Sequence, residues 1–414
     1  MTILTRIVLG LMVCASMNSI VNTSFAAEHH HQAMKPKKKQ MASCEGIEIT
    51  CAKTVTSAFA PNGDLWRLWA LDSSIYFQIS KDEGKTFSEE NRVGIDKEKI
   101  SARNENRPKI AFDKYQGVYL SWATPKKKKY TADVRFSYSS DYGKTFTQPV
   151  TVNDDNLITG HSFNEMLVTE EGDISIVWLD SRHSYQLRKQ GKKTNGSALY
   201  LGKANYSKKE FSFSNEQLAN NTCVCCRIAM NFNNYGETAV FWRHIYGDNI
   251  REFALITLAQ DDRKQQTPYQ ISYDRWKING CPHQGGAISI NENNRYHLVW
   301  FNQGEVGKGI FYASSDDQGK TLTKPVSVGM QSAQAAHPHM NTNGNRVDIV
   351  WTQFTGTEHE LWHQYSDDNG KSFKQAVMIA KAFNGSDRPF IITKDNMSYV
   401  SWQRPRQSHL VQVL

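Results

Sequence analysis

Thiol and imidazole side chains are concentrated in a few short stretches of this sequence. These stretches are Cys223-Val224-Cys225-Cys226, Cys281-Pro282-His283, His337-Pro338-His339 and the isolated His161. Thiolate sulfur and imidazole nitrogen are the ligands that tetrahedral Zn(II) prefers, and sulfur ligands also suit Cu(I). If the fold brings the stretches together, we expect a metal site, for copper first and zinc second. Its predicted ligands are Cys225, Cys226, Cys281 and His283, with His161, His337 and His339 as further candidates.

The same cysteines allow two other interpretations. In an oxidising compartment Cys223, Cys225, Cys226 and Cys281 could form two disulfides, which would leave the histidines to hydrogen-bond. A bridge between the adjacent Cys225 and Cys226 would be strained, and strained bridges are easily reduced, so a redox-active thiol site is the third interpretation. Haem attachment is not predicted, because no Cys-x-x-Cys-His motif occurs.

Three arginines stand in comparable places, each at the head of a predicted strand. Arg107 and Arg388 each precede a proline, and Arg227 follows the cysteine stretch directly. A planar guanidinium makes bidentate, charge-assisted hydrogen bonds to a carboxylate. The three arginines could therefore hold a carboxylated ligand, or they could position backbone carbonyls and pair with Asp387 and Glu165.

Short apolar strands that end in tryptophan recur about every fifty residues, which is the spacing of propeller blades. They end at Trp69, Trp122, Trp178, Trp242, Trp300, Trp351 and Trp402. We therefore predict an all-β fold, a β-propeller of four-stranded blades, with seven blades and six as the alternative. We expect Ile47 to Thr50 to form an outer strand of the last blade, which would close the ring. The inner strands of a propeller begin at one rim of its central channel. The stretches that carry the cysteines, histidines and arginines precede such strands, so they should converge on one site.

A turn motif repeats between these strands. Its copies are Ser80 to Phe87, Ser139 to Phe146, Ser315 to Leu322 and Ser366 to Phe373. In each copy an Asp can accept backbone N–H bonds, a Gly tolerates positive φ, and the last residue can anchor the turn on a sheet. The repeat resembles the Asp-box (BNR) repeats of the sialidase superfamily, and the resemblance covers essentially the whole mature chain.

That resemblance implies an exo-glycosidase of the exo-alpha-sialidase type as an alternative function. Sialidases hold the substrate carboxylate with three arginines, a role that Arg107, Arg227 and Arg388 would fill here. Such enzymes also need an aspartate acid and a Tyr/Glu nucleophile pair. The candidates are Asp180, Glu165 and either Tyr246 or Tyr312, although no family motif matches them. The cysteine-rich stretches depart from the family pattern, which favours metal binding.

Residues 1–43 have a different character from the rest. Residues 1–26 combine Arg6, a short apolar run and a small-residue end at Ala26, which predicts a secretory signal peptide. Residues 27–43 are polar and rich in His and Lys, which predicts a disordered leader before a propeller domain of residues 44–414. Cleavage after Ala26 would expose Ala27-Glu28-His29, a square-planar ligand set for Cu(II) or Ni(II), although the leader could equally be a plain polar tether.

Export implies a periplasmic or secreted protein with disulfides, and Cys44 and Cys51 are the predicted local pair. The formal net charge is +8, and lysines concentrate in runs at 35–39 and 126–129. Without a recognition motif these runs predict solvated charge rather than nucleic-acid binding, and no membrane span is expected. We therefore expect a metal-handling or binding protein, with a metal ion or a small carboxylated sugar as ligand and a periplasmic protein as partner. The alternatives are the exo-glycosidase and a disulfide-stapled scaffold that binds carbohydrate or protein.

Overall fold

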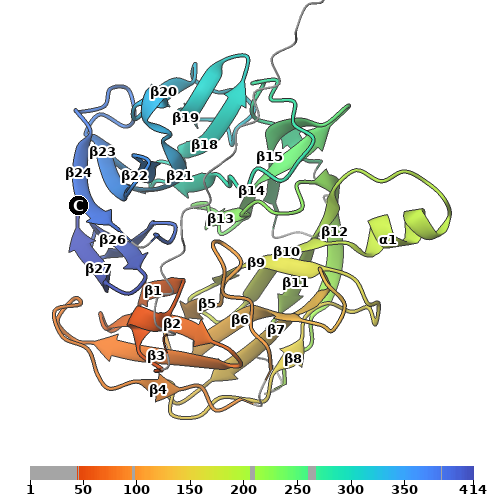
Figure 1. Ribbon diagram of the computed structural model, residues 1–414, viewed down its shortest axis with the longest axis vertical. Helices are drawn as coiled ribbons and strands as arrows, with labels where there is room; N and C mark the ends of the chain where they lie inside the picture. Colours follow the sequence, from red (N-terminus) through yellow and green to blue (C-terminus); the bar gives the residue numbers. More distant parts are fainter. Residues whose placement is uncertain (1–43, 45, 96–97, 206–209, 260–266, 384) are drawn as a thin grey trace, which may run out of the picture. The chain divides into compact units, whose positions relative to one another are not determined.

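Seven blades of antiparallel strands surround a central axis in residues 46–414, and a strand pairing joins blades three and four into one eight-stranded sheet (Figure 1). The structure is a computed structural model of residues 1–414, and it describes Cys44 and the ranges 46–95, 98–205, 210–259, 267–383 and 385–414. The predicted signal peptide (1–26) and leader (27–43) lie outside the described residues. Each inner strand lies beside the inner strands of two neighbouring sheets, and the first lies beside the last, so the ring is closed. The fold is a seven-bladed β-propeller, and the alternative of six blades is wrong.

The strands of each blade follow one another outward from the axis. The inner strands are β1 (Val55–Phe59), β5 (Lys109–Phe112), β9 (His161–Val168), β13 (Ala229–Phe232), β17 (Ala287–Ile290), β21 (Ala336–Asn343) and β25 (Phe390–Lys394). The second strands are β2 (Leu65–Leu71), β6 (Val118–Pro125), β10 (Ile174–Asp180), β14 (Thr238–Tyr246), β18 (Tyr296–Gly304), β22 (Arg346–Phe354) and β26 (Met397–Arg404). The third strands are β3 (Ser74–Ser80), β7 (Ala132–Ser139), β11 (Ser197–Ala204), β15 (Ile250–Leu258), β19 (Gly307–Ser315), β23 (His359–Ser366) and β27 (Ser408–Val413). The outer strands are β4 (Asn91–Arg92), β8 (Val150–Thr151), β12 (Ser214–Thr222), β16 (Tyr269–Gln270), β20 (Val326–Val328) and β24 (Val377–Ala382).

The repeated tryptophans anchor the core, as their spacing predicted. All seven lie on second strands and are almost fully buried. A buried indole N–H needs an acceptor, and most of the seven find one close by. Trp178 donates to Asp180 Oδ2 at 2.9 Å, and Trp402 donates to the Asp387 carbonyl at 2.9 Å. The tryptophan strands therefore tie the apolar faces of most blades to nearby polar groups.

The turn motif has one hydrogen-bond network in all four copies. In the second copy the Ser139 hydroxyl donates to Asp141 Oδ1 and accepts the Gly143 amide, each at 2.8 Å. The Thr145 amide and hydroxyl donate to the two Asp141 oxygens at 2.8 and 2.6 Å. The hydrogen bonds from Thr145 lower the pKa of Asp141 to about 2. The motif is thus a turn device between the third and fourth strands, as predicted.

The start of the propeller differs from one expectation. We expected Ile47 to Thr50 to form an outer strand of the last blade, and that prediction is wrong. Ile49–Cys51 is instead a 3₁₀ turn, η1. Its carbonyls accept from the last blade, where the Gln403 side chain donates to Ile49 at 2.8 Å and the Arg406 amide donates to Thr50 at 2.9 Å. The last blade has three strands within the described part of the chain.

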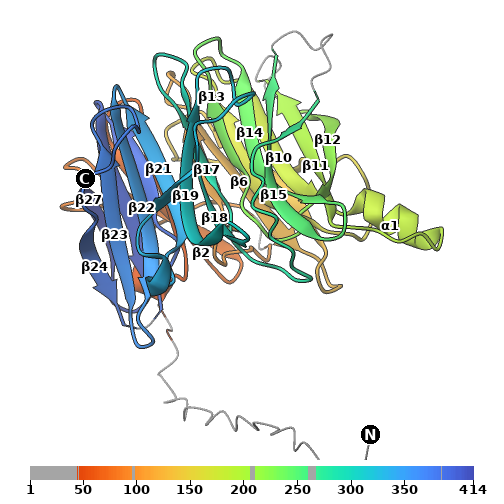
Figure 2. The ribbon, with the colours of Figure 1, turned by 90° about the horizontal axis from the view of Figure 1, so that it is seen from above.

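One α-helix interrupts the third blade. Helix α1 (Arg182–Lys189) follows β10 and projects beyond the sheets, as both ribbon views show (Figure 2). A second 3₁₀ turn, η2 (Gln331–Ala333), precedes β21. Among the described residues, neither α1 nor any other helix has the length and apolar character needed to cross a membrane.

Candidate metal centre

The cysteine stretches lie in two loops that lead to neighbouring inner strands. Cys223 to Cys226 connect β12 to the inner strand β13 of blade four. Cys281 and His283 lie between β16 and the inner strand β17 of blade five. Because both loops end at inner strands, they meet at one rim of the propeller, as the sequence predicted. The Cys223 amide donates to the Arg243 carbonyl at 2.9 Å, which fixes the first loop on the second strand of its own blade.

Five side chains form two overlapping groups of metal-ligand atoms. The sulfur atoms of Cys223, Cys225 and Cys226 all lie within 4.8 Å of one another. The sulfur atoms of Cys225 and Cys281 and a ring nitrogen of His283 meet the same limit, so Cys225 belongs to both groups. Zinc–sulfur bonds of about 2.3 Å in a tetrahedral site place the ligand atoms about 3.8 Å apart. The sulfur atoms of Cys223 and Cys225 are already 3.9 Å apart, whereas those of Cys223 and Cys226 are 2.7 Å apart and would have to separate if both bound one metal ion.

The two groups differ in their access to solvent. Cys223, Cys225 and Cys226 are buried, whereas Cys281 and His283 are exposed. The site therefore has a buried thiol interior and an open outer side. An ion could enter from solvent through Cys281 and His283 and reach the sulfur-rich interior through Cys225.

The pKa values of the buried thiols are shifted in opposite directions. The Cys223 sulfur lies 2.7 Å from that of Cys226, and hydrogen bonds from the thiols of Cys225 and Cys226 lower the pKa of Cys223 well below its usual range. The positive charge of Arg243 acts in the same direction. Burial raises the pKa of Cys226. The arrangement stabilises a thiolate on Cys223, and a thiolate is the form of cysteine that binds metals.

The structure has free thiols at four cysteines, which are Cys223, Cys225, Cys226 and Cys281. Cys44 and Cys51 form the predicted disulfide. Cys223 is the ligand candidate that the sequence interpretation left out of the metal set. Its Cys-x-x-Cys spacing to Cys226 was the signal that could have included it.

Neither His337 nor His339 belongs to the two groups of ligand atoms. His337 is buried, and burial together with the charge of Arg388 lowers its pKa well below the usual range. The charge of His283 also lowers the pKa of His337, so the two side chains lie near each other. No described residue forms a hydrogen bond with His337 Nδ1. His339 lines the central channel, where its Nδ1 accepts the Ile391 amide at 3.1 Å.

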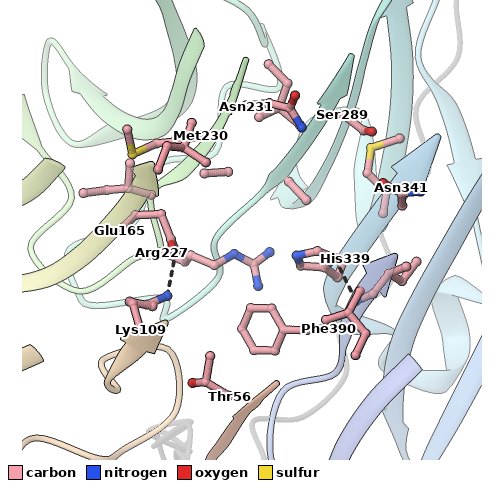
Figure 3. Close-up of a pocket in the computed structure, with 18 of the residues that line it drawn as sticks. Thr56, Lys109, Glu165, Arg227, Met230, Asn231, Ser289, His339, Asn341 and Phe390 are labelled. Carbon is pink, nitrogen blue, oxygen red and sulfur yellow. Dashed lines mark hydrogen bonds and ion pairs between the residues drawn. The ribbon is translucent and has the colours of Figure 1, made fainter. Parts of the chain in front are cut away.

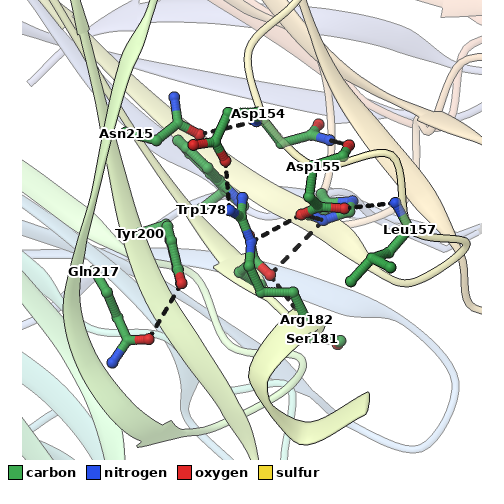
Figure 4. Close-up of polar contacts among 12 residues, drawn as sticks. Asp154, Asp155, Leu157, Trp178, Ser181, Arg182, Tyr200, Asn215 and Gln217 are labelled. Atoms are coloured by element: carbon green, nitrogen blue, oxygen red, sulfur yellow. Dashed lines mark hydrogen bonds and ion pairs between the residues drawn. The ribbon is translucent and has the colours of Figure 1, made fainter. Parts of the chain in front are cut away.

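His161 and Asp180 belong to a separate buried ion network between blades two and three. His161 Nδ1 lies 2.7 Å from the Ala132 carbonyl, and Nε2 lies 2.9 Å from Asp155 Oδ2. Arg182 Nε approaches Asp155 and Asp180 at 2.8 and 2.9 Å (Figure 4). Both ring nitrogens of His161 are engaged, so the structure does not bring this residue into the cysteine group.

Arg107 and Arg227 line the channel, where protein groups already engage both, and Arg388 lies close enough for their charges to act on it. Arg107 forms an ion pair with Asp387, and Arg227 donates to the carbonyls of Gly286 and Pro338 and lies 2.9 Å from Glu105. Glu165 pairs with Lys109 at 2.6 Å. Figure 3 shows this part of the channel, where the Arg227 guanidinium points toward His339 and lies 5.5 Å from the centre of the Phe390 ring. The cavity has a volume of about 270 Å³.

Arg388 differs from the other two arginines. Burial lowers its pKa, and the nearby charges of Glu105 and Asp387 oppose that effect. No described residue accepts a hydrogen bond from Arg388 Nε. Arg227 Nη1 also lacks a hydrogen bond among the described residues, but it lies 2.9 Å from Glu105, so Arg388 Nε is the donor with neither a hydrogen bond nor an ion pair in the described part of the chain.

Comparison with known proteins supports the architecture. A Hadza microbial sialidase superposes with a TM-score of 0.51 at 11% identity, covering 83% of this chain and 73% of that chain. A lectin from Burkholderia pseudomallei superposes with a TM-score of 0.53 at 10% identity, covering 88% of this chain and 98% of that chain. The protein has a sialidase-like β-propeller fold. No family model matches the sequence, and no curated protein matches it either. At such low identity the likeness establishes the fold of this sialidase-like propeller alone.

Proposed function

We propose that this sialidase-like propeller is a metal-handling protein that binds one soft transition-metal ion, copper(I) first and zinc(II) second, through Cys225, Cys226, Cys281 and His283. Cys223 completes the sulfur-rich interior. The observation that carries the proposal is the convergence of five thiol and imidazole side chains from two loops, with Cys225 common to both halves. Sulfur-rich sites of this kind favour Cu(I), and a Cys/His set also suits Zn(II).

The electrostatics of the site support a thiolate-bound cation. Hydrogen bonds from Cys225 and Cys226, together with the charge of Arg243, lower the pKa of the Cys223 thiol, which favours the thiolate that binds metals. Each further thiol that binds the metal must lose its proton, so the affinity should fall as the pH falls. The exposed outer pair, Cys281 and His283, gives the ion a path from solvent.

A competition titration of the full chain with a chromophoric Cu(I) chelator tests this proposal. We expect one Cu(I) per chain, and Cys225→Ser should weaken binding by about a hundredfold or more, because it removes the ligand shared by both halves. Cys281→Ser should weaken it less. The control is the double variant Cys44→Ser/Cys51→Ser, which removes two sulfurs and a disulfide but no proposed ligand, and which should bind normally.

Two results would overturn the proposal. The first is no Cu(I) or Zn(II) binding by the reduced protein. The second is stoichiometric binding that Cys225→Ser leaves unchanged but that is lost when His29, His30 and His31 are replaced by Gln, which would place the ion in the leader. Metal content of the purified full chain, measured before any loading, gives an independent check.

The exo-glycosidase hypothesis has its own test. Arg107 and Arg227 are engaged by Asp387, Glu105 and backbone carbonyls, so Arg388 is the arginine on which a substrate carboxylate would depend. Hydrolysis of a fluorogenic sialoside that Arg388→Met abolishes would favour this second function. Arg388→Met should leave Cu(I) binding unchanged.

A further inference from the structure

A second, larger cavity lies directly over the open side of the cysteine group. We call it the Tyr130 cavity, after the tyrosine at its rim. Its volume is about 860 Å³, and Cys225, Cys281 and His283 are part of its lining. A volume of about 300–1,000 Å³ is typical of sites for small organic ligands. The cavity is therefore large enough for an organic molecule that reaches the proposed metal ligands.

The charge of the Tyr130 cavity has one sign. Lys128, Lys129 and Arg188 line it, and none of its described lining residues is an Asp or Glu. Lys128, Lys129 and Arg188 are exposed, and no ion pair joins any of them to a carboxylate of the described residues. The Lys129 ammonium lies 4.8 Å from the Tyr130 ring centre, and Arg188 Nη1 donates only to Thr194 at 3.3 Å. Three cations that no carboxylate of the described residues neutralises favour an anionic ligand.

The walls of the Tyr130 cavity are largely apolar or aromatic. Three large apolar side chains of this lining are exposed, with exposed fractions of 86% for Tyr130, 58% for Ile158 and 43% for Val224. Phe163 and Tyr185 also line the cavity. Exposed apolar groups clustered around a concavity mark a binding surface rather than scattered surface residues. The walls thus fit a ligand with an aromatic or apolar body.

We propose that the Tyr130 cavity binds an organic anion with an aromatic or apolar body, which lies against the metal ligands Cys225, Cys281 and His283. Lys128, Lys129 and Arg188 bind the anionic group, and Tyr130, Ile158 and Val224 contact the body. The anion's role as a neighbour of the metal rests on the proposed function. The binding of the anion does not, because the cavity exists without the ion.

Two matched dyes test the binding in metal-free protein. The first is 8-anilinonaphthalene-1-sulfonate, and the second is N-phenyl-1-naphthylamine, which has the same aromatic body without the sulfonate. We expect the sulfonate to bind about tenfold more tightly, since charge-assisted contacts distinguish the two dyes. The triple variant Lys128→Gln/Lys129→Gln/Arg188→Gln should remove that preference and leave binding of the neutral dye unchanged.

The control variant has the same change in net charge at a distance from the cavity. It is Lys144→Gln/Lys320→Gln/Lys371→Gln, which replaces three exposed lysines of the turn motifs. This variant should keep the preference for the sulfonate dye. Equal affinities of the two dyes for the wild-type protein, or equal losses in both triple variants, would overturn the inference.

A second measurement separates this inference from the proposed function. Loading the wild-type protein with Cu(I) should shift the affinity for the sulfonate dye by about threefold or more, because the ion and the dye share the cavity. The Cys225→Ser variant should show no such shift. If the dye preference holds but no Cu(I) binds, the proposed function fails and the anion site stands. If Cu(I) binds at Cys225 and the dye affinity does not shift, the contact between anion and metal is refuted.

Discussion

Arg107 and Asp387, which are 280 residues apart in the sequence, form a bidentate ion pair with N–O distances of 2.6 and 2.5 Å. Both side chains are almost fully buried. Asp387 also accepts the Val55 amide at 3.1 Å, and Arg107 donates to the Val55 carbonyl at 3.0 Å. The pair therefore joins the last blade to the first two and closes the ring of sheets.

Removal of one partner of this pair should destabilise the propeller strongly. Arg107→Met or Asp387→Leu should each lower the free energy of unfolding by about 3–5 kcal/mol, because each leaves a buried charge without its partner. The double variant should lose much less than the sum of the two losses. Urea unfolding of the four proteins measures these differences. Additive losses would mean that the pair is not coupled in the folded protein.

The buried His161 should make the folded protein less stable at alkaline pH. Burial alone would lower its pKa, but hydrogen bonds with Asp133 and Asp155 and the charge of Asp180 raise the pKa to about 9. Because the pKa of His161 is higher in the folded protein than in the unfolded chain, its protonation stabilises the fold. This stabilisation is fully present below the unfolded pKa of 6.5 and is lost as the pH rises through about 9. The loss is at most about 3 kcal/mol.

The measurement is the free energy of unfolding between pH 6.5 and 9.5. The wild-type protein should lose stability across this range, and His161→Gln should have a flatter profile because it carries no titrating ring. A matched control is His183→Gln, on helix α1, which should keep the wild-type slope. Parallel profiles for His161→Gln and wild type would contradict the assignment of the proton to His161.

The fold was predictable because its signals are local. A strand that ends in a buried tryptophan and a turn such as Ser139 to Phe146 can each be recognised from a few adjacent residues, and their repetition fixes the number of blades. Ile47 to Thr50 carried no such signal. Its apolar residues suit a strand, but the Gln403 side chain and the Arg406 amide engage its carbonyls in the folded ring.

The candidate site was predictable only in part, for a related reason. The position of Cys225 and Cys281 ahead of inner strands places them at one rim, whichever way the side chains point. For His161 the direction of the side chain decides whether it can join the cysteine group. Its partners Asp133 and Asp155 come from other segments, and nothing in the sequence indicates these contacts. The Arg107–Asp387 pair was one of the alternatives that the sequence left open, whereas Glu165 pairs with Lys109 instead.

The turn motif of the second blade packs against the first blade at Gly143. Gly143 has φ +85°, and a Cβ atom there would lie 2.7 Å from the Trp66 ring. Gly143→Ala should therefore cost about 1–2 kcal/mol for the left-handed backbone and about 1–3 kcal/mol more for overpacking against Trp66. Gly191→Ala is the matched control, because Gly191 has φ +72° and open space around it, so only the backbone cost applies. Urea unfolding compares the two variants. Equal losses would show that the Trp66 ring can move aside at no cost, and that its contact with the turn motif of the second blade adds no stability.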